Sequence, residues 1–216
     1  SPAGLSTTTQ TVEYMRDELR KVYAPEDLVQ VLPAPVNKAL TQELMNQVDL
    51  VVVTGSQNNV RRAYSSGTPA IGVGAGNVPV IIDSTADLPD AAKKIMMSKC
   101  FDNATSCSSE NAVTILDDVY EDAIQALKEV GGYLVTAEEK QRILETLWVD
   151  GHLNRHVIAK DPDVLAEHCG LSEEAKSAKF FLVEDQNGVG KDYPLSDEKL
   201  SLVLTVYRAK DFTEAK

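Results

Sequence analysis

One cysteine stands in a run of small hydroxyl residues, and this run carries the clearest chemistry in the chain. Cys107 follows Thr105 and Ser106 and precedes Ser108 and Ser109. These hydroxyl side chains are poor core material, and they can donate hydrogen bonds to a thiolate or an oxyanion. The pattern favours Cys107 as a nucleophile, although a free cysteine is more often a small buried apolar residue.

The other two cysteines, Cys100 and Cys169, lack such neighbours, and we interpret them as core or surface thiols. Three cysteines without a CxxC pair form no metal or disulfide framework, so we expect no metal site. The same usage favours a reducing cytoplasmic setting. A Cys–His hydrolase stays open as an alternative, because the chain contains three histidines that the sequence cannot place relative to Cys107.

Two glycine-containing turns are candidates for ligand binding. Thr54-Gly55-Ser56 follows an apolar run and precedes a helix start. Free amides at a helix N-terminus bind phosphate, although an ordinary helix cap gives the same pattern. The segment 72–77 reads GxGxG and leads into a strand pattern, so it fails the context of a Rossmann fingerprint. It is either a crossover at which backbones touch or a loop pressed against a flat ligand such as nicotinamide.

Composition narrows the class of partner. The chain has 216 residues, of which 43% are hydrophobic, and its net charge is −12. This is enough apolar material for a core. The acidic surface argues against nucleic acid and anionic membranes as partners, and no apolar run is long enough to cross a bilayer. A bound anion is still allowed, because local amides can hold it.

Helix and strand patterns alternate along the chain, which indicates an α/β fold. Helical spacing of apolar residues covers 12–22, 40–44, 58–64, 88–100, 119–130 and 138–149. Strand patterns cover 28–32, 49–53, 70–73, 80–82, 112–116, 156–159, 180–183 and 202–206. The run at 49–53 is apolar on both faces, as expected of a buried parallel strand. Residues 186–193 contain two glycines and are predicted to form a surface loop.

Several motifs in the same order resemble the CoA-acylating branch of the aldehyde dehydrogenase superfamily. The similarity is strongest over 51–56, 64–67, 70–87, 98–111 and 198–212. The segment 104–111 is most similar to acylating dehydrogenases for succinate semialdehyde or sulfoacetaldehyde. The acetaldehyde domains of bifunctional aldehyde–alcohol dehydrogenases are more distant at this loop.

The resemblance implies a role for each motif. Cys107 falls at the nucleophile position, and Thr105, Ser106, Ser108 and Ser109 would line the substrate pocket. The turn Thr54-Gly55-Ser56 matches the turn that binds the pyrophosphate of NAD or NADP. Gly74 lies in the segment that passes between this cofactor and the cysteine. The glutamate at the Glu198 position holds the hydroxyls of the nicotinamide ribose.

One position separates the acylating branch from the water-using one. Water-using relatives carry a glutamate that activates water where this chain has Val73, and valine cannot act as a base. A thioester on Cys107 would therefore wait for coenzyme A as co-substrate. A water-using dehydrogenase with a different base remains an alternative. The chain also departs from common family residues at Val60 and Leu202, which leaves the choice between NAD and NADP open.

The family layout predicts an aldehyde dehydrogenase-like fold in two parts. Residues 1–76 would be the later part of a Rossmann-like NAD(P) domain, and residues 77–216 most of an α/β catalytic domain. Because the chain starts at Ser1, we expect a fragment that binds cofactor poorly by itself. The complete protein would be a cytoplasmic homo-oligomer, in some cases inside a bacterial microcompartment. It would reversibly oxidise a small, anionic aldehyde to its acyl-CoA.

Acetaldehyde oxidation by a domain of an aldehyde–alcohol dehydrogenase is the nearest alternative. A non-catalytic cofactor-binding or interaction module of the same fold is a second alternative, from another class of protein. The hydroxyl-rich surroundings of Cys107 argue against that second alternative.

Overall fold

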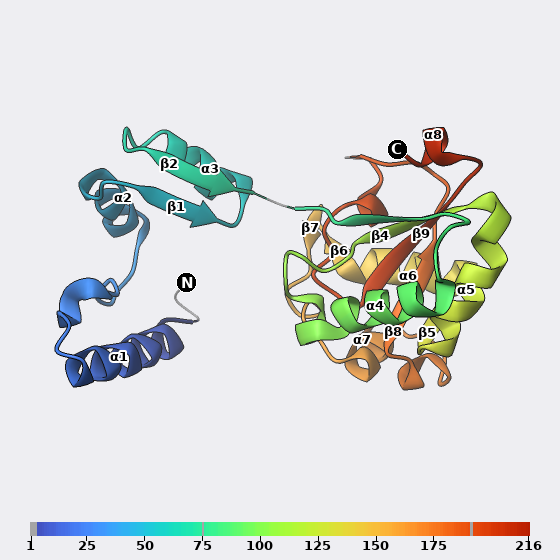
Figure 1. Ribbon diagram of the computed structural model, residues 1–216, viewed down its shortest axis with the longest axis horizontal. Helices are drawn as coiled ribbons and strands as arrows, with labels where there is room; N and C mark the ends of the chain where they lie inside the picture. The colour runs from blue at the N-terminus through green and yellow to red at the C-terminus, as the bar shows by residue number, and fades with distance from the viewer. Residues whose placement is uncertain (1–3, 75, 191) are drawn as a thin grey trace. The chain divides into compact units, whose positions relative to one another are not determined.

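The computed structural model describes residues 4–74, 76–190 and 192–216 of the chain. It forms two compact units, Ser1–Gly74 and Ala75–Lys216 (Figure 1). The boundary lies close to the one expected from the family layout. That the first unit binds a dinucleotide remains a prediction.

The first unit contains three helices and a two-stranded parallel sheet among its described residues. Its elements are α1 (Leu5–Lys21), a 3-10 turn (Glu26–Leu28), α2 (Lys38–Gln47), β1 (Val51–Thr54), α3 (Gln57–Tyr64) and β2 (Ala70–Val73). Strand β1 pairs in parallel with β2, and Val51 lies opposite Ala70. Helix α3 buries Val60 and Ala63. The helix and the two strands form the strand–turn–helix unit that the sequence predicts.

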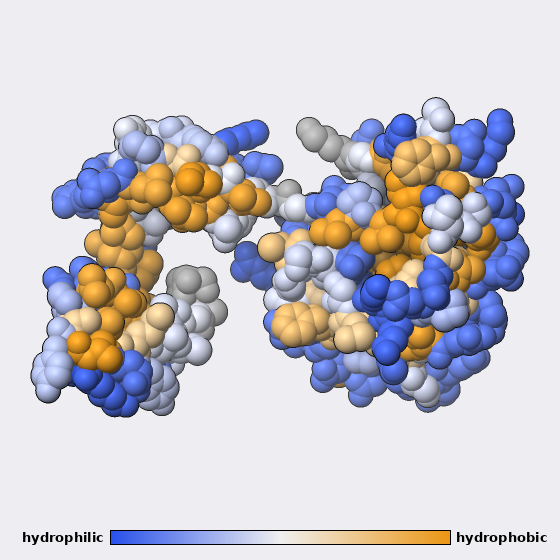
Figure 2. All heavy atoms as spheres, in the orientation of Figure 1, coloured by the Kyte–Doolittle hydropathy of each residue, from blue (hydrophilic) through white to orange (hydrophobic). Residues whose placement is uncertain are grey.

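One face of the β1–β2 sheet is open, contrary to the prediction of a strand buried on both faces. Val52 and Ile71 are 69% and 57% exposed, and Figure 2 shows apolar side chains gathered over these strands. Helix α3 packs on the sheet, but nothing described in this unit buries those two side chains. The strand predicted over 28–32 is also absent from the described residues. A 3-10 turn ends at Leu28, and no strand partner follows it.

The second unit is built on a five-stranded, wholly parallel sheet. Its strands are β3 (Pro79–Ile82), β4 (Ala112–Leu116), β5 (Gly132–Leu134), β8 (Phe180–Glu184) and β9 (Val203–Ala209). They lie in the order β3-β4-β9-β8-β5. The central strands are buried because apolar residues occupy both of their faces. This sheet confirms the expected α/β class.

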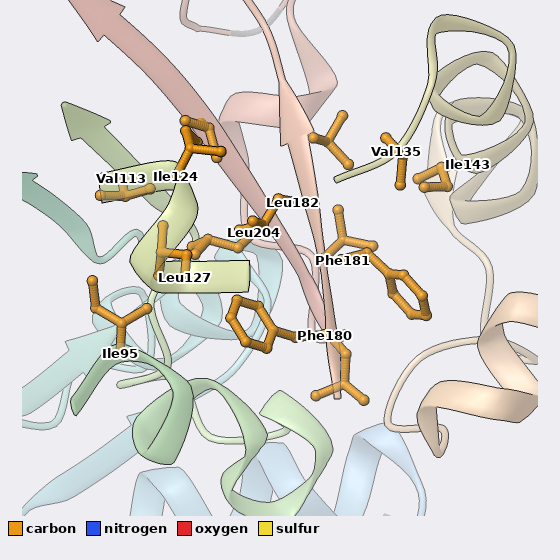
Figure 3. Close-up of a cluster of buried hydrophobic side chains, with 14 of the residues drawn as sticks. Ile95, Val113, Ile124, Leu127, Val135, Ile143, Phe180, Phe181, Leu182 and Leu204 are labelled. Atoms are coloured by element: carbon orange, nitrogen blue, oxygen red, sulfur yellow. The ribbon is translucent and has the colours of Figure 1, made fainter. Parts of the chain in front are cut away.

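Helices cover both faces of this sheet. They are α4 (Leu88–Cys100), α5 (Tyr120–Glu129), α6 (Ala137–Leu147) and α7 (Pro162–His168), and a short α8 (Phe212–Ala215) ends the chain. Adjacent residues of β8 point to opposite faces, as strand geometry requires. In Figure 3, Phe180 lies on the side of Ile95 and Leu127, and Phe181 lies on the side of Ile143. All five of these side chains belong to one buried core.

A small hairpin replaces two of the predicted elements. Strands β6 (Trp148–Val149) and β7 (His152–Leu153) pair antiparallel. Asp150 and Gly151 turn between them with φ of 51° and 73°. An Asp-Gly pair with positive φ at both residues is the usual two-residue hairpin turn. The helix predicted to reach residue 149 therefore ends at Leu147, and residues 156–159 form turns instead of the predicted strand.

Candidate active site

Three loops of the second unit meet because the strands that follow them are parallel neighbours. Strand β4 pairs with β3 on one side and with β9 on the other. The loops that enter these strands therefore open at one edge of the sheet. They are residues 76–78, residues 101–111 with Cys107, and residues 195–202 with Glu198. The sheet thus brings the predicted nucleophile loop beside the predicted ribose-binding segment.

Hydrogen bonds join these three loops directly. The side-chain amide of Asn77 donates to the Ser196 carbonyl at 2.7 Å. The backbone N–H of Asn111 donates to the Val78 carbonyl at 3.0 Å. The backbone N–H of Lys199 donates to Oδ1 of Asn111 at 3.1 Å. Asn111 therefore contacts both neighbouring loops and holds the end of the Cys107 loop between them.

The three thiols differ in exposure. Cys107 is exposed, Cys100 is partly buried, and Cys169 is buried. Burial raises the pKa of Cys100, and it raises the pKa of Cys169 to about 11. A raised pKa lowers the fraction of reactive thiolate near neutral pH. Of the three cysteines, Cys107 is the one in the exposed class.

The hydroxyls around Cys107 bond to one another and to the backbone. Oγ of Ser106 and Oγ of Ser108 lie 2.8 Å apart, and Thr105 donates to the Asp102 carbonyl at 2.6 Å. Among the described residues none of the loop hydroxyls, including buried Ser109, bonds to the Cys107 sulfur. This differs from the expectation that they donate to the thiolate. They shape the loop instead, because short hydroxyl side chains readily satisfy nearby polar groups.

Backbone strain lies at the start of the Cys107 loop. Asp102, Asn103 and Ala104 have φ of 49°, 51° and 60°. This left-handed region costs roughly 1–2 kcal/mol for a residue with a side chain. The amide of Asn103 donates to Asp161 at 2.8 Å, which ties the strained turn to the start of α7. Strain of this kind persists where surrounding structure fixes the backbone, often at functional sites.

Two buried lysines lie behind these loops, and sequence reasoning missed both of them. Lys99 and Lys199 are 1% and 0% exposed. A signal was present for Lys99, because it falls four residues after Ile95 on the apolar stripe of α4. Glu198 is partly buried, and burial raises the pKa of its carboxyl group. The edge of the sheet therefore combines an accessible thiol with polar groups withdrawn from water.

The first unit carries the remaining residues that are predicted to bind the cofactor. Thr54, Gly55 and Ser56 are exposed between β1 and α3. Gly55 adopts a φ of +136° that favours glycine, and its N–H donates to the Val73 carbonyl at 3.2 Å. Ser56 caps α3 by accepting from the Asn59 amide at 3.4 Å. The structure thus shows an exposed turn before a capped helix, and its binding of phosphate stays a prediction.

The glycine-rich segment serves packing in the first unit. A Cβ on Gly74 would lie 2.6 Å from the side chain of Gln57, and one on Gly72 would lie 2.8 Å from Val60. At Gly74 only the flexible end of Gln57 stands in the way, whereas Gly72 is enclosed by Val60, Tyr64 and Val53. The close packing at Gly72 supports the interpretation as a close crossover. In the second unit a Cβ on Gly76 would lie 3.7 Å from the Cys107 carbonyl oxygen. The end of this segment therefore passes next to the Cys107 loop.

Comparison with known proteins agrees with this arrangement. Residues 4–140 match the model of the aldehyde dehydrogenase family. The chain belongs to the aldehyde dehydrogenase family. It is 51% identical to the acylating sulfoacetaldehyde dehydrogenase of Cupriavidus necator, covering 100% of this chain and 44% of that protein. It is 36% identical to the acetylating succinate-semialdehyde dehydrogenase of Clostridium kluyveri, covering 99% of this chain and 47% of that protein.

Solved aldehyde dehydrogenase structures share the fold over the whole chain. An acetylating aldehyde dehydrogenase from Geobacillus thermoglucosidasius superposes with a TM-score of 0.93 at 37% identity, covering 100% of this chain and 47% of that one. A propionaldehyde dehydrogenase from Rhodopseudomonas palustris with bound propionyl-CoA gives 0.87 at 27% identity, covering 100% and 47%. An engineered glycolyl-CoA reductase with bound NADP+ gives 0.81 at 28% identity, covering 93% and 45%.

The chain spans about half the length of these relatives. The sequence and structure matches confirm the resemblance to acylating aldehyde dehydrogenases and the expected fold. No helix in the described part of the chain has the length and apolar character needed to cross a bilayer.

Proposed function

We propose that this chain carries the nucleophile and part of the NAD(P) site of a CoA-acylating aldehyde dehydrogenase. The observation that supports this most is the position of Cys107. It is the exposed member of three thiols, and it lies at the edge of the sheet where three loops meet. The names of the acylating relatives point to the same chemistry.

The reaction starts at the sulfur of Cys107. Its thiolate attacks the aldehyde carbon, a C–S bond forms, and the carbonyl electrons move to oxygen. Among the described residues no acceptor takes the Cys107 N–H, so this group is free to stabilise the oxyanion. When the carbonyl re-forms, the hydride leaves and a thioester remains on Cys107. Bound NAD(P) would supply the two-electron acceptor for that hydride.

A thiol then removes the acyl group from Cys107. The sulfur of coenzyme A attacks the thioester, the bond to Cys107 breaks, and acyl-CoA leaves. The overall change is aldehyde, CoA and oxidised cofactor to acyl-CoA, reduced cofactor and one proton. Val73 stands where water-using relatives carry a base, and its side chain is 57% exposed without any proton-accepting group. The same steps in reverse reduce an acyl-CoA.

The groups that would hold the cofactor lie on both units. Thr54, Gly55 and Ser56 offer an exposed turn at a helix N-terminus for the pyrophosphate. Gly74 belongs to the segment that would lie beside the nicotinamide, and Glu198 would accept hydrogen bonds from the ribose hydroxyls. The residues present fit these roles. The choice between NAD and NADP is decided by measuring KM for both.

Sulfoacetaldehyde is the proposed substrate, and succinate semialdehyde is the runner-up. The hydroxyl side chains of Thr105, Ser106 and Ser108 beside Cys107 suit a small anionic aldehyde better than an apolar one. The test is steady-state kinetics of the complete polypeptide that contains this chain, with CoA and either cofactor. We expect sulfoacetaldehyde to give the highest kcat/KM. A kcat/KM for acetaldehyde far above the values for both anionic aldehydes would favour the alternative of an acetaldehyde domain of an aldehyde–alcohol dehydrogenase.

Product analysis and thiol labelling distinguish the acylating enzyme from a water-using enzyme and from a non-catalytic module. An acyl-CoA product that requires CoA supports the proposal, whereas a free acid formed without CoA indicates a water-using enzyme. A non-catalytic module predicts no turnover. Because Cys107 is the exposed thiol, it would be labelled first in that case too, so the parallel loss of turnover is the result that separates the two hypotheses. We expect iodoacetamide at pH 7.5 to modify Cys107 before Cys100 and Cys169, with turnover lost in parallel.

A further inference from the structure

Two fully buried lysines support the active-site loops from the interior of the second unit. Nζ of Lys99, at the end of α4, donates to the Glu110 carbonyl at 2.8 Å. Nζ of Lys199 donates to the carbonyls of Leu195 at 2.7 Å and Asp197 at 3.1 Å. Each ammonium or amine thus ends on the main chain of a loop that carries a predicted active-site residue.

The positions of these bonds are informative. Glu110 lies three residues after Cys107, and Asp197 directly precedes Glu198. The Cys107 loop also has a bond within itself, from the Ser109 N–H to the Ser106 carbonyl at 3.0 Å, and bonds to neighbouring segments, such as the one from the Asn111 N–H to the Val78 carbonyl at 3.0 Å. Lys99 holds the Cys107 loop from helix α4, whereas Lys199 belongs to the 195–202 loop and braces that loop from within. The bond between Asn111 and Lys199 joins the two loops to each other.

We propose that Lys99 and Lys199 are positioning residues: Lys99 sets the place of Cys107, and Lys199 sets the place of Glu198. The inference rests on the proposed function for the roles of Cys107 and Glu198. Neither lysine is exposed to substrate, so each would act through the backbone that it holds.

The cost of burying two amines argues against a purely stabilising role. Burial lowers the pKa of Lys99 to about 7, against the opposite pull of Glu110 and Cys100. Burial and the charge of Lys99 also lower the pKa of Lys199 well below its usual range, and Asp197 opposes this shift. Buried ion pairs are often replaceable by apolar side chains of similar volume without loss of stability, so a buried charge is weak evidence of a stabilising role. A costly pair kept next to an active site is typical of residues retained for function.

Buried polar atoms without partners in the same two loops also argue against a purely stabilising role for the lysines. Oγ of Ser109, Oε2 of Glu110 and Oγ of Ser201 are buried without a hydrogen-bond partner among the described residues. Each such group costs free energy that a core built for stability alone avoids. All three lie in the two loops that the lysines hold. The interior behind the loops is therefore polar beyond what packing requires.

The test uses the complete polypeptide with Lys99→Met and Lys199→Met, because methionine fills the lysine stem but has no donor. The matched control is Lys93→Met, an exposed lysine on the same helix. Three quantities are measured for each: the rate of Cys107 labelling by iodoacetamide, kcat and KM, and the melting temperature. For Lys99→Met we expect labelling and kcat to fall at least tenfold, with cofactor KM within twofold. For Lys199→Met we expect cofactor KM to rise at least tenfold.

Melting temperature distinguishes positioning from structure. We expect both variants to melt at or above the wild-type temperature, and Lys93→Met to match the wild type throughout. Unchanged labelling and kinetics, or failure of both variants to fold, would overturn the proposal and assign the lysines a structural role. Labelling needs no turnover. If the wild type shows no CoA-dependent activity while labelling still falls in Lys99→Met, the proposed function fails and the positioning of the thiol stands.

Discussion

The side-chain oxygen of Asn111 accepts a hydrogen bond from the backbone nitrogen of Lys199 at 3.1 Å, and this bond joins the Cys107 loop to the Glu198 segment. The two loops enter neighbouring parallel strands, so they reach the same edge of the sheet. Asn111 is only 4% exposed, and Lys199 is fully buried. Because both groups are buried, water cannot readily take the place of either partner, and losing one leaves the other without a hydrogen bond.

Removing that acceptor should destabilise the second unit. In Asn111→Ala the Lys199 N–H is left buried and unpaired, which costs about 1–3 kcal/mol of unfolding free energy. Urea unfolding followed by circular dichroism measures this loss. Asn111→Asp is the matched control, because it keeps an oxygen at the same place. If Asn111→Ala unfolds within ~0.5 kcal/mol of wild type, a range typical of neutral surface changes, the bond does not hold the loops together.

Because the backbone at Ala104 is strained, replacing this buried alanine by glycine should stabilise the protein. Its φ of 60° is in the left-handed region, so Ala104→Gly should raise the unfolding free energy by up to ~1 kcal/mol. Ala104→Val should lower it by at least ~2 kcal/mol, since a β-branched residue fits this region worst. The control is Ala123→Gly, a buried helical alanine of α5 that should lose ~1 kcal/mol. Equal losses in both glycine variants would show that Ala104 is unstrained.

The depressed pKa of Lys99 predicts how stability depends on pH. Below about 7 the lysine is charged in both the folded and the unfolded chain, so the full burial cost is present. Between about 7 and the ordinary lysine pKa, the unfolded chain binds the extra proton, and stability rises with pH.

Unfolding free energies from pH 7.5 to 9.5 check this sign with Lys99→Met as the comparison. The wild type should gain up to ~1.4 kcal/mol per pH unit relative to the variant. Parallel pH profiles for the two proteins would mean that Lys99 titrates normally.

Glu198 should affect the cofactor and leave the thiol unchanged. Glu198→Gln keeps the shape but removes the charge that strengthens a hydrogen bond to a ribose hydroxyl, worth about 1.5–3 kcal/mol. We expect cofactor KM to rise roughly tenfold to a hundredfold. The rate of Cys107 labelling is the internal control and should stay at the wild-type value. An unchanged cofactor KM would remove Glu198 from the binding site.

The strands of the central sheet are predictable from the sequence, because buried parallel strands have short, continuous apolar sequences. Strands Ala112–Leu116 and Phe180–Glu184 lie where the pattern predicts them. The run at 156–159 is also apolar, but it pairs with no strand in the described structure. Pairing depends on residues distant in sequence, which a local pattern cannot supply. The Asp150-Gly151 turn was readable, and it accounts for the helix ending early.

The nucleophile was predictable, and the groups that support it were not. Cys107 stands out because its hydroxyl neighbours are unsuited to a core. Lys99 and Lys199 went unnoticed because lysine is almost always exposed. Their burial depends on carbonyl groups that tertiary folding brings within reach of Nζ. The role of Asn111 could not be predicted either, because its hydrogen-bond partner Lys199 lies 88 positions away in the sequence.

Trapping the acyl group on sulfur tests the central claim most directly. The complete polypeptide is mixed with sulfoacetaldehyde and oxidised cofactor without CoA, and peptide mass spectrometry locates the adduct. We expect an acyl group on the peptide that contains Cys107, its discharge as acyl-CoA when CoA is added, and no adduct in Cys107→Ala. Reduced cofactor formed at the wild-type rate by Cys107→Ala, or an adduct on another residue, would contradict the assignment of Cys107 as the nucleophile.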